Sequence, residues 1–446
     1  MTKKTKINFD SLRAPKGTRD LLGEDYEFQK EISEKAEKIA TYYGFSPIET
    51  PHIEKEGLFT ATLGETSDVV EKQMYTIRTK GGDHLVLRPE YTAPVMRAYI
   101  EHGMHTIPQP VMLYYNGALF RHENPQKGRL REYHTFGLEI LGAEDEIADA
   151  LILRLTTLIL KEIGIKSYIV NINSIGDKVC APIYKKELVS FLRKKTGHLC
   201  NDCKRRLKTN PLRILDCKEE KCKEIVSNAP QMIDFLCEDC NRHFKTVLEY
   251  LDELDIPYIL DNCLVRGLDY YSRTVFEIFE ETAEEGTATN GNIEEKEKQS
   301  KTALAAGGRY DYLGQILAGK NVPGVGVGIG IERLALILKE QSGAGKEKRK
   351  QKSPKIYLIQ LGELAKRKSL LLLEDLRKAH IPVYHSLSKD SLRGQLKSAA
   401  NLNTEIALII GQKEALENSV IARNMETGSQ EIIEISKIAE YLKEKI

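Results

Sequence analysis

Arginines, carboxylates and aromatic side chains alternate along residues 119–142, LFRHENPQKGRLREYHTFGLEILG. Arg121 and Glu123 end one extended stretch, and Tyr133 and Glu139 lie in the next. A guanidinium group offers a planar fork of donors that suits a phosphate, and an aromatic ring stacks on a nucleobase. Isolated surface charges are usually only solvated. The dense alternation here favours instead a hairpin face that binds a phosphate and a base.

The cysteines give a second chemical signal, because six of the eight fall within one short segment. LCNDCKRRLKT and LCEDCNRHFKT repeat a Cys-x-x-Cys pair followed by basic residues. In a reducing compartment such clustering favours a metal or free thiols over disulfides, and four thiolates make a closed structural zinc site. A zinc site would combine Cys200 and Cys203 with either Cys217 and Cys222 or Cys237 and Cys240. Alternatively, all six cysteines are buried thiols in a small helical domain. The six are Cys200, Cys203, Cys217, Cys222, Cys237 and Cys240.

Composition limits the class of protein. The chain has 446 residues, of which 41% are apolar, enough for about three domains of roughly 150 residues each. A net charge of +1 excludes a uniformly basic nucleic-acid coat but permits local basic faces. No run of about 18 apolar residues occurs, and MTKKTKINFD lacks the apolar stretch of a secretory signal. We therefore expect a globular, cytoplasmic protein without a membrane span.

Periodicity then predicts the elements that position these residues. A helix is expected over residues 26–43, and the acidic first turn and terminal glycine of 145–164 predict a second one. The strand pattern returns after the cysteine segment, which makes that segment an insertion of residues 178–255. The expected strands or strand–helix units lie at 84–100, 109–123, 133–142, 263–279 and 324–340.

Two polar stretches look like connectors. Residues 280–302 are acidic and predict a protruding or disordered hairpin tip, and residues 341–354 are a linker rich in glycine and lysine. Beyond it, strands alternate with helices, which predicts a separate α/β domain of residues 355–446. Its strands are expected at 355–361, 381–386, 405–411 and 419–424, and its helices at 364–379 and 392–402.

These motifs resemble those of a known family. The hairpin is similar to motif 2 of class II aminoacyl-tRNA synthetases, and GVGVGIGIERLALIL from Gly324 resembles their motif 3. LVRGLDYYSRTVFE from Leu264 and AAGGRYDYL from Ala305 resemble the two signature peptides of the histidyl-tRNA synthetases. APKGTRDLL and LRPEYTAPVMRAYI fit the same family, so the resemblance covers nearly the whole chain.

The resemblance implies both a fold and an activity. The fold is an α+β catalytic domain with an antiparallel sheet over residues 1–340, interrupted by the helical insertion and followed by an anticodon-binding α/β domain. The activity is ligation of L-histidine to tRNA(His), through a histidyl-adenylate formed from ATP with release of pyrophosphate. Mg²⁺ would accompany ATP. The helix from Tyr26 and the strand after it would form the interface of a homodimer.

Site residues are implied by the same resemblance. Arg266 would stabilise the transition state at the α-phosphate that Arg121 holds, and Glu90 and Thr92 would accept hydrogen bonds from the α-ammonium of histidine. The histidine set is Glu90, Tyr91, Thr92, Arg121, Thr135, Glu139, Arg266, Tyr270, Tyr271 and Tyr310. The ATP set is Arg121, Glu123, Arg129, Tyr133 and Arg333. Gln126, Lys127 and Arg131 are expected at the acceptor end of tRNA.

Three points stay open at this stage. The family often has glutamine where Thr135 stands, so the role of Thr135 in holding the ammonium is open. Arg266 could instead form a structural ion pair with Asp269. As for function, one alternative is a histidyl-synthetase-like regulatory subunit of histidine biosynthesis, and another is a zinc-dependent nucleic-acid-binding protein.

Overall fold

The computed structural model describes residues 12–64, 67–126, 128–281, 303–341, 355–386 and 391–445. The chain divides into two compact units, between residues 344 and 345. The polar stretch at 280–302 and the linker at 341–354 lie almost entirely outside the described residues. No helix in the described ranges is long and apolar enough to cross a membrane.

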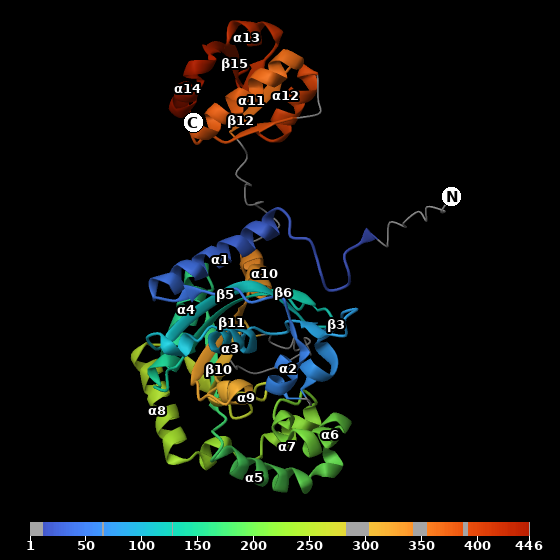
Figure 1. The fold of residues 1–446 in the computed structure, drawn as a ribbon, viewed down its shortest axis with the longest axis vertical. Coiled ribbons are helices and arrows are strands. Elements are labelled where there is room, and N and C mark those ends of the chain that lie inside the picture. The colour runs from blue at the N-terminus through green and yellow to red at the C-terminus, as the bar shows by residue number, and fades with distance from the viewer. Residues whose placement is uncertain are drawn as a thin grey trace, which may run out of the picture. The chain divides into compact units, whose positions relative to one another are not determined.

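An eight-stranded sheet forms the centre of the first unit (Figure 1). Its middle strands are antiparallel, as predicted, but both edges add a short parallel strand, so the sheet is mixed. In spatial order the strands are β1 (Ser46–Pro47), β5 (Val111–Phe120), β6 (Glu132–Leu141), β11 (Gly324–Gly330), β10 (Ala305–Arg309), β9 (Ser272–Glu280), β7 (Tyr168–Ser174) and β8 (Tyr258–Leu260).

Long helices cover one face of this sheet. Helix α1 (Glu24–Tyr42) packs against α4 (Ile147–Ile163) and α10 (Ile331–Gln341), and α4 also packs against α8 (Glu238–Glu253). Alternate apolar residues of the strands meet these helices in one core. A fully buried leucine or valine side chain of this kind contributes roughly 1.5–3 kcal/mol. Gly164 ends α4 with a φ of 108°, which confirms the predicted helix stop.

The opposite face of the sheet carries shorter elements. Helices α2 (Glu56–Leu63), α3 (Thr92–Glu101) and α9 (Leu313–Ala318) pack together there. A three-stranded sheet lies beside them, in the order β2 (Ile53–Lys55), β4 (His84–Leu87) and β3 (Tyr75–Arg78). A second apolar core joins α2 and α3 to β5. The site described below lies on this face.

The cysteine segment is helical and lies between strands that are spatial neighbours. β7 pairs with both β8 and β9, so the chain leaves the sheet and returns to the same edge. Between them run α5 (Ala181–Arg193), α6 (Asn201–Thr209), α7 (Glu220–Val226) and α8, with a small core of their own. Helix α8 belongs to both parts, because Cys240 lies in this small core whereas Val247 and Leu251 lie in the core of the sheet.

One predicted strand is wrong in its first half. A strand was expected over residues 263–279, but β9 begins only at Ser272, and residues 264–271 are irregular. A Cβ atom on Gly267 would lie 2.4 Å from Nη1 of Arg213, so the insertion approaches this backbone closely. The irregular path also lets consecutive rings, Tyr270 and Tyr271, contact each other at 4.8 Å, whereas a strand would point them to opposite faces.

The second unit is an α/β fold, as predicted, and its sheet has five strands where four were predicted. Four strands and two helices lie where the sequence places them, and the buried central strands are covered on both faces. The order is β13 (Val383–His385), β12 (Ile356–Gln360), β14 (Ile406–Ile410), β15 (Ser419–Asn424) and β16 (Gln430–Glu434). Its helices are α11 (Glu363–Lys378), α12 (Leu392–Asn401), α13 (Gln412–Glu417) and α14 (Ile438–Lys445), of which α13 and α14, like β16, were not predicted.

Candidate active site

Alternating glycines in β11 make room for the site. Val325, Val327 and Ile329 point into the helix-covered core, so the glycines between them face the opposite side. A Cβ atom on Gly326 would lie 1.7 Å from Oε2 of Glu139, and one on Gly324 would lie 2.4 Å from the ring of Tyr310. The missing side chains therefore accommodate a carboxylate and an aromatic ring at the surface of the sheet.

Glu139, on β6, is the centre of a buried hydrogen-bond cluster. Its carboxylate accepts hydrogen bonds from the hydroxyls of Tyr310 and Thr92, the latter at 2.8 Å, and from that of Tyr115 at 3.5 Å. Burial raises the pKa of Glu139 to about 8, and burial also raises the pKa of Tyr310 well above its usual range. Tyr310 is therefore held as a hydrogen-bond donor to Glu139.

Glu90 is a second buried carboxylate, at the start of α3. It accepts hydrogen bonds from the backbone N–H groups of Thr92, at 2.6 Å, and Ala93, at 3.0 Å, and from the hydroxyl of Tyr270 at 3.4 Å. Burial raises its pKa to about 7. No ion pair within the described residues joins Glu90 or Glu139 to a cation. Two buried carboxylates in this state favour a cationic ligand, since a positive charge would stabilise their ionised form.

Two arginines, Arg121 and Arg266, add positive charge near this site, and a third, Arg333, lies where α10 meets the hairpin turn. The Nε of Arg121, just beyond β5, donates to the carbonyl of Pro89 at 2.8 Å. Arg266 pairs with Glu277 on β9, and its guanidinium lies 5.5 Å from the ring centre of Tyr271. The Nε atoms of Arg266 and Arg333 are buried without a hydrogen-bond partner in the described part of the chain. Buried donors of this kind suit an anionic ligand such as a phosphate.

The sequence left open a structural ion pair between Arg266 and Asp269, but in the structure Arg266 pairs with a different carboxylate. Asp269 accepts a hydrogen bond from Asn210 of the insertion at 3.0 Å, whereas Arg266 contacts Glu277. Glu277 was not among the predicted site residues. Its signal was present in the sequence, because Glu277 alternates with the apolar Phe276 and Ile278 along β9. Its partner, however, lies in an irregular segment that alternation cannot place.

The other residues of the predicted ATP set surround the hairpin turn. Arg129 lies 3.6 Å from Glu123, and the hydroxyl of Tyr133 lies 3.5 Å from the Pro89 carbonyl. Gly128 approaches Arg333, because a Cβ atom there would lie 3.3 Å from its Cδ. The hairpin turn therefore meets the first turn of α10 at Arg333.

Tyr91 and Thr135 are both buried. Tyr91 stacks on Tyr115 with ring centres 3.9 Å apart, and the guanidinium of Arg88 lies 4.0 Å from the ring of Tyr91. Tyr91 therefore supports the site from beneath. Thr135 lies on β6 on the same face as Glu139, and its methyl group faces Gly328.

The residues predicted to meet tRNA differ in their environment. Gln126 forms a bridge with Arg129 at the turn. Arg131 binds backbone, since its guanidinium donates to the carbonyls of Glu123 at 3.1 Å and Lys16 at 3.3 Å. Lys127 lies outside the described residues.

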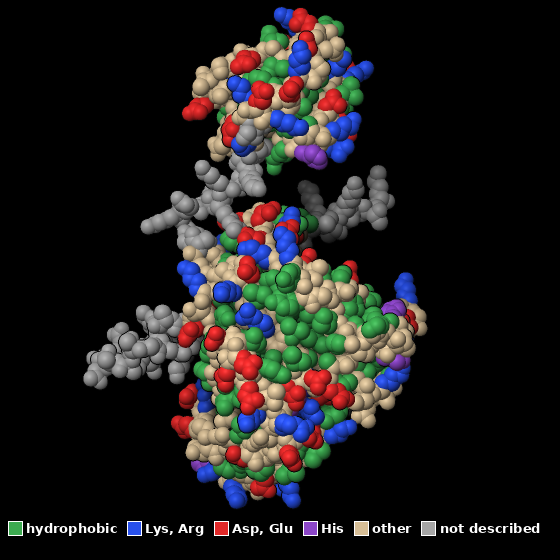
Figure 2. Space-filling model, turned by 90° about the vertical axis from the view of Figure 1, so that its left-hand side faces the viewer, with side chains coloured by type: hydrophobic (Ala, Val, Ile, Leu, Met, Phe, Trp, Pro, Cys, Tyr) green, Lys and Arg blue, Asp and Glu red, His purple; other side chains and the backbone are tan. Residues whose placement is uncertain are grey.

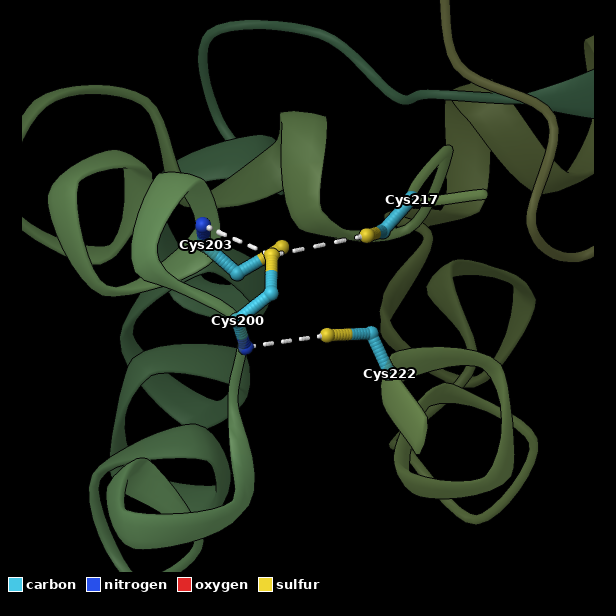
Figure 3. A group of neighbouring side chains, drawn as sticks. All are labelled: Cys200, Cys203, Cys217 and Cys222. Carbon is cyan, nitrogen blue, oxygen red and sulfur yellow. Dashed lines mark hydrogen bonds between the residues drawn. The ribbon is translucent and has the colours of Figure 1, made fainter. Parts of the chain in front are cut away.

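The cysteines form two groups rather than one. Four of them, drawn in Figure 3, converge so that their sulfur atoms lie within 4.8 Å of one another. The remaining Cys-x-x-Cys pair, Cys237 and Cys240, lies with Asp177 and Cys180 instead. Of the two pairings that the sequence left open, the structure brings together Cys200, Cys203, Cys217 and Cys222.

The sheet carries the hairpin that resembles motif 2, and β11 with α10 forms the stretch that resembles motif 3. Together with the separate α/β unit, these features define a class II aminoacyl-tRNA synthetase. Residues 17–334 match the family model described as histidyl-tRNA synthetase, and residues 355–445 match an anticodon binding domain. The chain belongs to the histidyl-tRNA synthetase family, which consists of ATP-dependent ligases.

Full-length relatives support this membership. The histidine–tRNA ligase of Dehalococcoides mccartyi is 39% identical, over 97% of this chain and 100% of that protein. The one from Syntrophotalea carbinolica is also 39% identical, over 98% and 99%. The crystal structure of apo histidyl-tRNA synthetase from S. aureus is 34% identical, with a TM-score of 0.74 over 97% of this chain and 100% of that one.

A more distant structure bears on the regulatory alternative. An ATP phosphoribosyltransferase regulatory subunit/histidyl-tRNA synthetase from Bacillus halodurans is 20% identical, with a TM-score of 0.58 over 90% of this chain and 98% of that one. This similarity shows the fold alone, so it does not favour a regulatory role.

Proposed function

We propose that the chain activates L-histidine with ATP and transfers the histidyl group to the 3′ end of tRNA(His). The observation that carries this proposal is the pair of buried carboxylates, Glu90 and Glu139, beside arginines with unpartnered donors. The first feature suits a cationic amino acid, and the second suits the phosphates of ATP.

In this proposal the carboxylates divide the recognition of histidine between them. Glu90, with the hydroxyl of Thr92, accepts from the α-ammonium, and Glu139 with Tyr310 binds one nitrogen of the imidazole ring. Tyr270 and Tyr271 enclose the ring. An amino acid without a ring nitrogen at this position would leave these buried groups unpaired, which gives discrimination on the order of 10⁴-fold. Threonine is shorter than the glutamine that the family often has, so the contact of Thr135 with the ammonium either passes through water or is made by a neighbouring residue.

Activation is an in-line attack. A carboxylate oxygen of histidine bonds to the α-phosphorus of ATP, and the bond to the bridging oxygen of the β-phosphate breaks, so pyrophosphate leaves. Arg266 and Arg121 stabilise the charge on the α-phosphate oxygens. Glu277 orients Arg266, because the two side chains form an ion pair. In the second step the terminal ribose hydroxyl of tRNA attacks the acyl carbon and AMP leaves.

The ATP base lies between Tyr133 and Arg333, with Glu123 accepting from its amino group and Arg129 near the phosphates. Mg²⁺ would neutralise phosphate charge. Among the described residues of the ATP set the carboxylate is Glu123, which pairs with Arg129. Phosphates and water would therefore supply most of the ligands of Mg²⁺, as this ion prefers.

Recognition of tRNA is divided between the two units. Gln126, Lys127 and Arg131 at the hairpin turn meet the acceptor end, where Arg131 acts in part by holding the backbone of the turn. The α/β unit reads anticodon bases, since sequence-specific RNA recognition targets unstacked loops.

A homodimer is proposed through α1 and the edge strand β1. Tyr42, at the end of α1, is 85% exposed, and β1 pairs through only two residues, so this edge of the sheet is largely open. Figure 2 shows hydrophobic side chains gathered over the middle of one face of the first unit. An exposed apolar area of this kind marks a protein interface.

A structural Zn²⁺ is proposed at the Cys₄ group. Zinc with Zn–S bonds of about 2.3 Å places tetrahedral sulfur atoms about 3.8 Å apart, and the Sγ atoms of Cys200 and Cys217 lie 3.9 Å apart (Figure 3). Four thiolates leave no open position for catalysis. Zinc binding needs reduced thiols, which agrees with the cytoplasmic location proposed for this chain.

The test is ATP–pyrophosphate exchange with purified protein. We expect exchange that depends on histidine, followed by acylation of tRNA(His). Folded protein that binds histidine without exchange would support the regulatory subunit, and protein that binds nucleic acid without exchange would support the zinc-dependent binding protein. Either outcome contradicts the ligase.

A further inference from the structure

A second group of metal-ligand residues lies at the root of the insertion. Asp177 and Cys180 follow β7, and Cys237 and Cys240 begin α8, 57 positions later (237 minus 180). One ligand atom from each lies within 4.8 Å of every other. We propose that this Cys₃Asp group is a second structural zinc site, separate from the Cys₄ group, which fastens the two ends of the insertion together.

The distances from two of the sulfur atoms to the carboxylate are close to those around a zinc ion. Bonds of about 2.3 Å to sulfur and 2.1 Å to oxygen at tetrahedral angles place the sulfur and oxygen atoms about 3.6 Å apart. The Sγ of Cys180 lies 3.4 Å from Oδ1 of Asp177, and the Sγ of Cys237 lies 3.9 Å from the same oxygen. The observed spacings bracket the expected one.

The local backbone is the same as in the Cys₄ group. Cys237 precedes α8 with φ and ψ of −65° and 165°, and Cys200 precedes α6 with −66° and 164°. Cys240 and Cys203 are each the third residue of these helices. The positive end of a helix stabilises a thiolate, which is the form that binds metal. The sequence repeat thus encodes one half-site that is used twice, once in each group.

Hydrogen bonds to the ligands fit the same assignment. The backbone N–H of Asp177 donates to the Sγ of Cys180 at 3.3 Å, as outer-shell donors to metal-bound sulfur do. The carboxylate of Asp177 accepts from the N–H groups of Val179 at 2.8 Å and Cys180 at 3.1 Å, which fixes its orientation. The turn that these two hydrogen bonds close, just before α5, accounts for Asp177 alone. It does not account for three thiols, two of them only 1% exposed, converging on that carboxylate.

The position of the site gives it a structural consequence. The carbonyl of Gly176 accepts from the N–H of Arg273 at 2.7 Å, and the ammonium of Lys178 lies 4.4 Å from the ring centre of Tyr312. Tyr312 follows Tyr310 of the active site by two residues. A metal here fixes the base of the insertion against the sheet edge and the loop that carries Tyr310. It leaves no open coordination position, so its role is orientation rather than catalysis.

The test is elemental analysis of zinc and iron in the full-length protein as purified. We expect about two zinc ions per chain and no iron, as two sets of four ligands require. Asp177→Asn keeps an amide oxygen that can accept from the turn before α5 but removes the negative charge. We expect it and Cys240→Ser to retain about one zinc. Cys217→Ser, in the other group, should also retain about one. Cys263→Ser is the matched control, because Cys263 is a half-buried thiol of the same small core that belongs to neither group.

Zinc content unchanged in Asp177→Asn and Cys240→Ser would overturn the proposal, as would a wild-type protein whose only zinc disappears in Cys217→Ser. Bound iron would overturn the assignment to zinc. If the variants fail to fold, Co²⁺ titration of metal-stripped wild-type protein decides. We expect two saturable sites, of which the three-thiolate one shows weaker thiolate-to-cobalt charge-transfer absorption per ion. A single site contradicts the proposal. None of these readouts depends on ligase activity.

Discussion

Opposite charges are kept apart on the active face, residue by residue. The carboxylates of Glu90 and Glu139 accept hydrogen bonds from hydroxyl and backbone N–H groups and do not pair with cations among the described residues. Arg266 instead forms an ion pair with Glu277 on β9. If the arginines paired with the carboxylates instead, each would neutralise the other before substrate bound. The hydrogen-bond partners therefore preserve both a site for a cation and a site for an anion.

Arg266 offers the most direct test of the catalytic proposal. We expect Arg266→Ala to lower the rate constant of histidine-dependent pyrophosphate exchange by about 10²- to 10³-fold, since it removes a preorganised donor to the transition state. Its effect on the KM for ATP should be small. Glu277→Gln keeps the size of the partner and weakens only the ion pair, so we expect a smaller loss in the same parameter. An increase in the KM for ATP as large as the decrease in the rate constant would point to a binding role for Arg266.

Histidine binding should release protons near neutral pH. The pKa of Glu90 is raised to about 7 by burial, so in the free protein this carboxyl is largely protonated below pH 7. A bound ammonium favours the ionised form and lowers that pKa, so the proton leaves on binding. Affinity should therefore fall as the pH decreases from about 8 to 6, by up to about tenfold per pH unit for one linked proton.

Titration calorimetry in two buffers of different ionisation enthalpy measures this release at pH 6.5. Glu90→Gln is the control, because it retains the titration of the histidine ligand itself and removes that of the carboxyl. Equal proton release from the wild type and Glu90→Gln would exclude Glu90 as the source.

At the scale of elements, strand β11 provides the space that the site requires. Its alternating glycines are required for space rather than for flexibility, because Gly326 has no positive φ and its Cβ would overlap the Glu139 carboxylate. We expect Gly326→Ala to displace Glu139 and lower kcat/KM for histidine by at least about 10²-fold, since a displacement of about 1 Å at a reacting site can cost that much.

Gly330→Ala is the matched control on the same strand and the same face. The nearest atom to a Cβ at Gly330 is 3.8 Å away, which is ordinary contact, so we expect kcat/KM within about threefold of the wild type. Thermal unfolding of both variants separates a local effect from loss of the fold. A similar loss in kcat/KM for both would show that β11 tolerates no side chain on the face where its glycines lie.

The elements themselves were largely predictable, because their cores follow simple periods. Helix α4 has an apolar stripe, an acidic first turn and a terminal glycine, and β11 alternates valine or isoleucine with glycine. By contrast, β16 is short, polar and mostly exposed, so no burial pattern marks it. The irregular segment at 264–271 was misread as strand, because its shape comes from packing against the insertion rather than from its own sequence.

The residues of the candidate site were predictable only where they lie in recognisable sequence motifs. Arg121, Glu139 and Arg333 were predicted because each lies in a recognisable stretch. The ion pair between Arg266 and Glu277 was missed, and so was the contribution of Cys180, which looked isolated in the sequence. Both depend on where the chain returns in space. Local pattern does not contain that information, since a residue 57 positions away can be a neighbour.

At the scale of the whole molecule, the two units have separate cores. Among the described residues, the apolar clusters of the first unit end at residue 338 and those of the second begin at residue 356. Every residue proposed to bind histidine or ATP lies in the first unit, whereas the anticodon binding domain match is confined to residues 355–445. Activation and tRNA selection are therefore expected to be separable.

Truncation after residue 341 tests this separation. We expect the fragment to keep histidine-dependent pyrophosphate exchange within a few-fold of the full-length protein, because its cores and its substrate residues are intact. Aminoacylation of tRNA(His) should fall by about 10²-fold, since loss of two stacked bases at roughly 1–2 kcal/mol each would cost that much in kcat/KM. The two assays use the same enzyme preparation, so active-site titration corrects both for misfolded protein. If exchange falls as far as aminoacylation, the second unit must also support the catalytic site, and the separate cores do not imply separate functions.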